Sequence, residues 1–160
     1  MRYAPAVPFP PYAYQPGQTP HPHTHPKGHS YGAPEPTATP LIEHNWRNNE
    51  VYLYGIDLFN YEYYWEAHEA WEGLWKLEES TAHRALFLQG LIQVAAMCIK
   101  RRAGNARGVE KLRSKAVLKL RLLCAETPYM GIDLGALCQT LIQRPLGSIS
   151  FSFVLTPWPQ

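Results

Sequence analysis

His68 and Glu72 are the two side chains of this sequence whose types and spacing point most directly to chemistry. They belong to the run Trp-Glu-Ala-His-Glu-Ala-Trp-Glu at residues 65–72, and a spacing of four residues places them on one face of a helix. Trp71 and Trp75 fall on the same face, so this is also the apolar stripe that must turn towards a core. An imidazole and a carboxylate turned inwards need polar partners, because an unpaired buried charge is costly.

The next helix can supply these partners. Gln89 and Gln93 are also four residues apart, and a short connection makes the two helices antiparallel neighbours. Gly90 would let these helices approach closely, and Arg84, one turn nearer the connection, is the cation best placed to reach Glu72. The predicted ligand pocket therefore consists of Trp65, His68, Glu69, Glu72, Trp75, Arg84, Gln89 and Gln93.

The cluster is compatible with several roles. Glu69 lies at the border of the inward face and Glu66 points nearly opposite to it. A satisfied polar network that only sets the helix register would give the same pattern. His68-Glu69-x-x-Glu72 lacks the second histidine of the zinc protease signature His-Glu-x-x-His, and no repeated Glu-x-x-His motif of a di-iron bundle is present. His68 and Glu72 can still offer two ligands to a divalent metal ion, although the sequence does not establish any cofactor.

Basic residues concentrate between positions 100 and 121. This stretch contains nine lysines and arginines and one acidic residue, Glu110, whereas the charged residues of 57–79 are seven acidic residues and one lysine. The simpler interpretation is complementary charge between helices together with a solvated face. The alternative is a surface for RNA or phosphate, in which a helix N-terminus holds the anion. Its candidate residues are Arg101, Arg102, Asn105, Arg107 and Gly108, although a net charge of +2 argues against a dedicated DNA-binding protein.

The composition divides the chain into four parts. Eleven of the 15 prolines stand at or before Pro40, and residues 1–40 contain few aliphatic side chains, so this Pro/His/Tyr-rich tract is expected to be disordered. Its histidines between positions 21 and 29 form either a weak metal chelator or a linker without a task. We expect an irregular lead-in over residues 41–58, a helical domain over 59–145 and an extended arm over 146–160, where apolar side chains alternate.

The helical domain is predicted to be all-α, a compact bundle of about four helices. The helices are expected over residues 60–77, 82–102, 106–125 and 134–143, with Asn60 as the first N-cap. No secretion leader is evident, no apolar stretch is long enough to span a bilayer, and the three cysteines lack the spacing of a zinc site. We therefore expect a cytoplasmic protein without membrane contacts. The sequence is compatible with a homo-oligomer.

Several separated motifs, in the right order, resemble the bacterial and archaeal family of domains of unknown function numbered 309. They are Phe59-Asn60, Tyr64-Trp65-Glu66-Ala67-His68-Glu69 with Glu72 and Trp75, Leu88-Gln89-Gly90-Leu91-Ile92-Gln93, Ala95-Ala96 and Gly104-Asn105-x-x-Gly108. The resemblance covers roughly residues 56–125 and departs from the family at Glu62 and Val109, where glycine and alanine are common. It implies a compact helical bundle in which His68, Glu69, Glu72, Gln89 and Gln93 are family features. It implies no activity.

Three functions follow from these patterns. We expect a binding or scaffold module whose polar cluster holds a small polar ligand or a protein partner. The first alternative is a hydrolase, either metal-dependent or using His68 as a general base that Glu69 and Glu72 orient. The second is an RNA- or phosphate-binding protein that uses residues 100–121. Access of solvent to the cluster separates a ligand site from a network that only sets the register.

Overall fold

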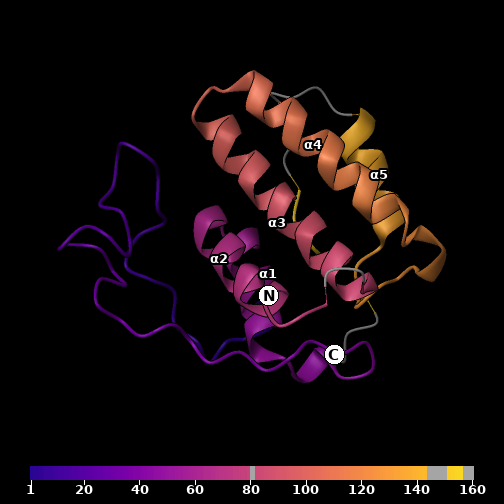
Figure 1. Ribbon diagram of the computed structural model, residues 1–160, viewed down its shortest axis with the longest axis horizontal. Helices are drawn as coiled ribbons and strands as arrows, with labels where there is room; N and C mark the ends of the chain where they lie inside the picture. Colours follow the sequence, from indigo (N-terminus) through magenta and orange to yellow (C-terminus); the bar gives the residue numbers. More distant parts are fainter. Residues whose placement is uncertain (80–81, 144–150, 157–160) are drawn as a thin grey trace.

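The computed structural model describes residues 1–79, 82–143 and 151–156 and shows an all-helical domain (Figure 1). Its elements are the 3-10 helix η1 (Trp46–Asn48), α1 (Glu50–Asn60), α2 (Tyr64–Trp75), α3 (His83–Arg102), α4 (Ala106–Arg121), the 3-10 helix η2 (Cys124–Glu126) and α5 (Leu134–Gln143). The described part of the chain contains no β-strand, which confirms the predicted fold class. No helix in it is long and apolar enough to cross a membrane.

The helix predicted over residues 60–77 is shorter and corresponds to α2, and a further helix, α1, precedes it. Asn49, not Asn60, is the first N-cap, and its side chain accepts the N–H of Tyr52 at 3.0 Å. Glu62, with φ of 69°, lies between α1 and α2 in the left-handed conformation that interrupts a helix. The predicted irregular lead-in over residues 41–58 is therefore wrong for its second half, which forms most of α1.

The burial of α1 explains why its sequence does not show a helical pattern. Its buried residues include five consecutive positions, Gly55 to Phe59, so buried side chains, among them the carboxylate of Asp57, surround the helix instead of forming one apolar stripe. Asn60, at its end, holds the C-terminal segment, because its side chain both donates to the carbonyl of Phe153 at 2.8 Å and accepts the N–H of Phe153 at 2.7 Å.

Helices α3 and α4 form a long antiparallel pair, with α5 beside α4 and α1 and α2 on the other side (Figure 1). The bounds of α3 and α5 agree with the prediction to within one residue, whereas α4 ends at Arg121, before the predicted end. Gly90 is required where α3 meets α4, since a Cβ atom there would lie 2.5 Å from Cδ2 of Leu120. The expected close approach is thus to α4 and not to α2.

The core of the described residues is rich in aromatic side chains. Trp71 of α2 is fully buried, and its Nε1 donates to the carbonyl of Tyr52 at 3.4 Å. Phe153, from the C-terminal segment, packs against Phe59 with ring centroids 4.7 Å apart. In residues 151–156 the side chains of Phe153 and Leu155 are buried, and Ser152, Val154 and Thr156, which alternate with them, are exposed. The remainder of the predicted arm, 146–150 and 157–160, lies outside the described residues.

The N-terminal tract packs against α1 and α2, which corrects the expectation that residues 1–40 are disordered. Asp57 of α1 is fully buried and accepts the backbone N–H groups of Tyr3 and Ala4, each at 2.8 Å. Arg2 lies with its Nε 3.4 Å from the same carboxylate. The expectation of disorder counted aliphatic residues, whereas this tract packs aromatic rings against the domain and donates backbone N–H groups to buried carboxylates.

Candidate functional site

A pocket of about 330 Å³ lies where α2, α3 and α4 meet. It is lined by His68, Glu72 and Trp75 of α2, by Gln89, Ile92 and Gln93 of α3, and by Lys119 of α4. Five of the residues that the sequence predicts for a ligand pocket therefore come together. The side chains of His68 and Glu72 are 24% and 32% exposed, so solvent reaches the cluster. The cluster is therefore open to solvent and not sealed.

Helical spacing brings the two sides of this pocket together. His68 and Glu72 are one turn apart on α2, and Gln89 and Gln93 are one turn apart on α3, so each pair shares a face. Lys119 reaches the pocket from α4, where its Nζ lies 3.5 Å from Oε1 of Gln93. Burial of its ammonium group and the charge of a neighbouring lysine, Lys115, both lower the pKa of Lys119.

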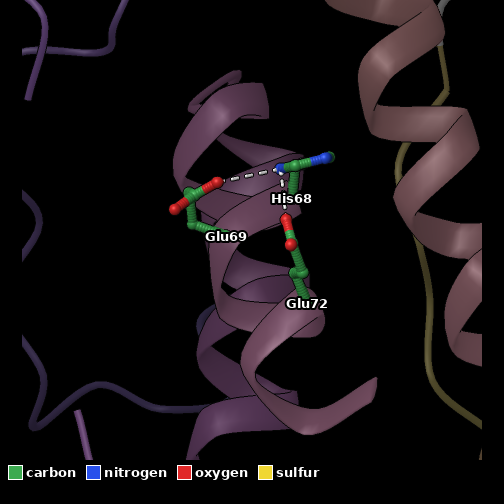
Figure 2. A group of neighbouring side chains, drawn as sticks. All are labelled: His68, Glu69 and Glu72. Atoms are coloured by element: carbon green, nitrogen blue, oxygen red, sulfur yellow. Dashed lines mark hydrogen bonds and ion pairs between the residues drawn. The ribbon is translucent and has the colours of Figure 1, made fainter. Parts of the chain in front are cut away.

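Glu69 joins His68 and Glu72 in a polar triad at the edge of this pocket (Figure 2). Nδ1 of His68 lies 3.2 Å from Oε1 of Glu69 and 3.7 Å from Oε2 of Glu72. Figure 2 shows this edge of the ring facing both carboxylates and the other edge pointing away from them. The hydrogen bond with His68 lowers the pKa of Glu69, despite a partial burial that would raise it. Glu72 also lies 3.6 Å from Nζ of Lys76.

Two residues of the predicted pocket lie elsewhere. Trp65 is covered by the N-terminal tract, where the rings of Tyr14 and His23 lie 5.3 Å and 5.5 Å from its own. Arg84 pairs with Glu78 at 3.0 Å and with Glu43 at 3.1 Å and does not line the pocket. The first turn of α3 lies next to the α2–α3 connection, so Glu78 is nearer to this guanidinium than Glu72 is.

The predicted anion-binding residues are partly engaged within the chain. Arg102 donates to the carbonyl of Glu62 at 2.9 Å, pairs with its carboxylate, and lies over the ring of Tyr64, 4.5 Å from its centroid. Asn105 caps α4 by accepting the N–H of Gly108 at 2.8 Å. This N–H therefore already has an acceptor within the protein.

Sequence reasoning missed Lys119 and also two buried carboxylates. Glu66 points away from the bundle, as predicted, but the N-terminal tract covers it, and only 6% of the residue is exposed. Its Oε1 accepts the N–H of Tyr14 at 2.8 Å and lies 3.1 Å from Nε2 of His29. The antiparallel argument used for α2 and α3, applied to α3 and α4 around Gly104, would have placed Lys119 across from Gln89. For Asp57 the signal was a single carboxylate inside an apolar run.

A family model, described as Domain of unknown function (DUF309), matches residues 52–112. This match confirms, over these residues, the resemblance seen in the sequence. They span most of α1, all of α2 and α3 and the first turns of α4, and they include every pocket-lining residue except Lys119. The N-terminal tract lies outside the match. No curated protein and no solved structure matches the chain.

Proposed function

We propose that this helical domain binds a small zwitterionic molecule in the pocket between α2, α3 and α4. The proposal is supported by one observation: the same open pocket is lined by a carboxylate, Glu72, and by an ammonium group, Lys119. Its volume of about 330 Å³ is at the lower end of the range for small-molecule sites, roughly 300–1,000 Å³. A ligand of the size of an amino acid suits this space.

Opposite charges on the two sides of the pocket define the class of ligand. Among the described side chains, Glu72 is paired with His68 and Lys76 and not with Lys119, so the ammonium group remains available to an anion. A ligand with one ammonium and one carboxylate group can satisfy both sides. A purely anionic ligand would be repelled by Glu72, and a purely cationic one would be repelled by Lys119, which gives selectivity by charge.

The remaining lining residues supply orientation and apolar contact. The amides of Gln89 and Gln93 each offer donors and an acceptor, so they can bind either end of a dipolar ligand. Trp75 and Ile92 provide the apolar surface that such pockets present to the body of a ligand.

Calorimetry with a charge-matched panel of compounds tests this proposal. The panel contains the common amino acids, their amides as cations and their N-acetyl derivatives as anions. We expect saturable binding of at least one amino acid with Kd below about 1 mM, and at least tenfold weaker binding of its amide and its N-acetyl derivative. Lys119→Met and Glu72→Gln should abolish this binding. Lys115→Met, an exposed position one turn away on α4, is the matched control and should retain it.

The charge panel also contains the result that would reject the proposal. If no amino acid binds in this range, or if the singly charged derivatives bind equally well, the pocket is not a zwitterion site.

A divalent metal ion is the second candidate ligand, and a separate observation favours it. One nitrogen of His68 and one carboxylate oxygen from each of Glu69 and Glu72 lie within 4.8 Å of one another. Zinc and manganese take mixed nitrogen and oxygen ligands of this kind. Three protein ligands would leave a coordination position for water, which is the arrangement that metal-dependent hydrolysis requires.

Metal titration distinguishes this second candidate. With zinc or manganese, we expect one equivalent to bind to the wild-type chain and none to His68→Gln. His83→Gln replaces an exposed histidine at the start of α3 and should leave binding unchanged. A chain with His21, His23 and His25 changed to glutamine removes the contribution of the N-terminal tract. The absence of a stoichiometric metal would eliminate the candidate.

A further inference from the structure

Three tyrosines on one side of the domain enclose the side chain of Phe9. The ring of Phe9 lies 6.2 Å from that of Tyr54, 5.0 Å from that of Tyr61 and 5.1 Å from that of Tyr63, measured between centroids. Tyr54 belongs to α1, and the other two lie in the connection between α1 and α2. These three residues, called here the tyrosine cluster, form an aromatic surface on which an extended segment of the N-terminal tract lies.

The hydroxyl groups of this cluster bind the backbone on both sides of Phe9. Tyr54 donates to the carbonyl of Pro8 at 2.9 Å, and Tyr63 donates to the carbonyl of Pro10 at 3.3 Å. Proline has no N–H and a fixed φ, so a Pro-x-Pro segment offers carbonyl acceptors from a chain that loses little entropy on docking. Aromatic rings with hydroxyl donors are the means by which domains recognise proline-rich segments.

A buried carboxylate anchors the residues that precede this segment. Asp57, also on α1, accepts the N–H groups of Tyr3 and Ala4, and Arg2 lies between it and Phe9, with its guanidinium 4.1 Å from the ring centroid. Without a chain at this place Asp57 would lose these partners. The surface therefore accepts a chain that presents N–H groups first, makes a turn in which the N–H of Val7 donates to the carbonyl of Ala4, and then presents proline carbonyls.

The surface and the segment that covers it belong to different parts of the chain. The tyrosine cluster and Asp57 all lie within residues 52–112, which match the family, whereas residues 2–10 lie outside the match. Apart from those of the Arg2 guanidinium, these contacts use the ring of Phe9 and backbone groups, which another proline–aromatic–proline segment also possesses.

We propose that this face of the domain is a docking surface for an extended proline–aromatic–proline segment of a partner protein. Residues 8–10 occupy the surface in cis, and the partner's segment competes with them. The proposal concerns the face formed by α1 and the α1–α2 connection and is independent of the ligand pocket between α2, α3 and α4.

Binding of a labelled peptide to the full chain tests the proposal. The probe is a fluorescent peptide with the sequence of residues 1–13, and Phe9→Ala in the full chain weakens the segment that occupies the surface in cis. We expect Phe9→Ala to bind the peptide at least tenfold more tightly than the wild-type chain. A peptide with alanine in place of the phenylalanine and its two neighbouring prolines should not bind.

Removal of hydroxyl groups shows whether the tyrosine cluster is the binding surface. In the Phe9→Ala background, Tyr54→Phe together with Tyr63→Phe should weaken peptide binding by about tenfold or more, because two hydrogen bonds are lost. Tyr31→Phe removes an exposed hydroxyl elsewhere in the N-terminal tract and should have no effect. Equal binding to the wild-type and Phe9→Ala chains, or no effect of the double change, would overturn the proposal.

A measurement on the unmodified chain covers the case in which Phe9→Ala does not fold. Unlabelled peptide at millimolar concentration, added to the isotopically labelled wild-type chain, should accelerate amide hydrogen exchange at Tyr3 and Ala4 as the cis segment is displaced. Unchanged exchange would contradict the proposal. If a second copy of the full chain displaces the segment and the peptide does not, the face is an interface between copies and the proposal is wrong.

Discussion

Replacement of Asp57 by alanine should destabilise the protein more than replacement of any exposed acidic residue. Its carboxylate is fully buried, accepts two backbone N–H groups at 2.8 Å and lies 3.4 Å from Nε of Arg2. Asp57→Ala removes the acceptor of two backbone N–H groups, each at a cost of about 1–3 kcal/mol, and removes the carboxylate beside the Arg2 guanidinium, which keeps its hydrogen bonds to the carbonyls of Ala4 and Val7. We therefore expect the free energy of unfolding to fall by about 3–5 kcal/mol, the range for breaking a buried pair.

Urea unfolding followed by tryptophan fluorescence measures this loss. Asp57→Asn keeps one acceptor oxygen and should lose about half as much stability as Asp57→Ala. Asp133→Ala is the control, because Asp133 is exposed and its side chain accepts the N–H of Ala136, at 2.9 Å, at the start of α5. Loss of such a helix cap costs about 1 kcal/mol.

Hydrogen exchange supplies the result that would refute this reasoning. The reasoning would be refuted if Asp57→Ala lowered the free energy of unfolding by less than about 1 kcal/mol while the amides of Tyr3 and Ala4 remained protected from exchange. Two buried N–H groups would then have lost their acceptor without measurable cost, and Asp57 would not be the anchor of the N-terminal tract.

Three further changes test the packing and the electrostatics of the bundle. Gly90→Ala should destabilise the protein by about 1–3 kcal/mol in urea unfolding, because its Cβ would lie 2.5 Å from Leu120, and the same change should cost less in a Leu120→Ala background, where that side chain is shortened. Asn60→Ala should cost about 1–3 kcal/mol by removing both hydrogen bonds to the backbone of Phe153, and an equal melting temperature would contradict this. The pKa of Glu69 is lowered in the folded state, so its contribution to stability is present above the ordinary value of 4.5 and is lost as the pH falls through the folded pKa. When the pH is lowered from about 6 to about 3, the melting temperature of Glu69→Gln should therefore fall less than that of the wild type. An equal fall in both proteins would show that ionised Glu69 does not stabilise the fold.

Helical periodicity predicted the parts of the structure that depend on local spacing. The bounds of α3 and α5, and the pocket that His68 and Glu72 share with two glutamines, could be predicted, because side chains three or four residues apart share a face in any helix. An antiparallel arrangement of neighbouring helices then placed Gln89 and Gln93 beside them. The candidate pocket is in this sense largely a property of the sequence.

Other features arise only when distant segments cover one another. A helical stripe identifies the side that faces the bundle but not whether another segment covers the opposite side. The burial of Glu66 followed from packing of the N-terminal tract, which composition alone predicts to be disordered.

The sequence by itself determined which side chains of α2 and α3 face each other, because that depends on the pitch of the helix and the length of one short connection. Only the tertiary structure decided that Lys119 completes the pocket, that Gly90 faces α4, and that Asp57 anchors a chain more than 50 residues away. The physical reason is that a buried polar group is stabilised by whichever donor the fold brings to it, and in this protein those donors come from distant parts of the chain.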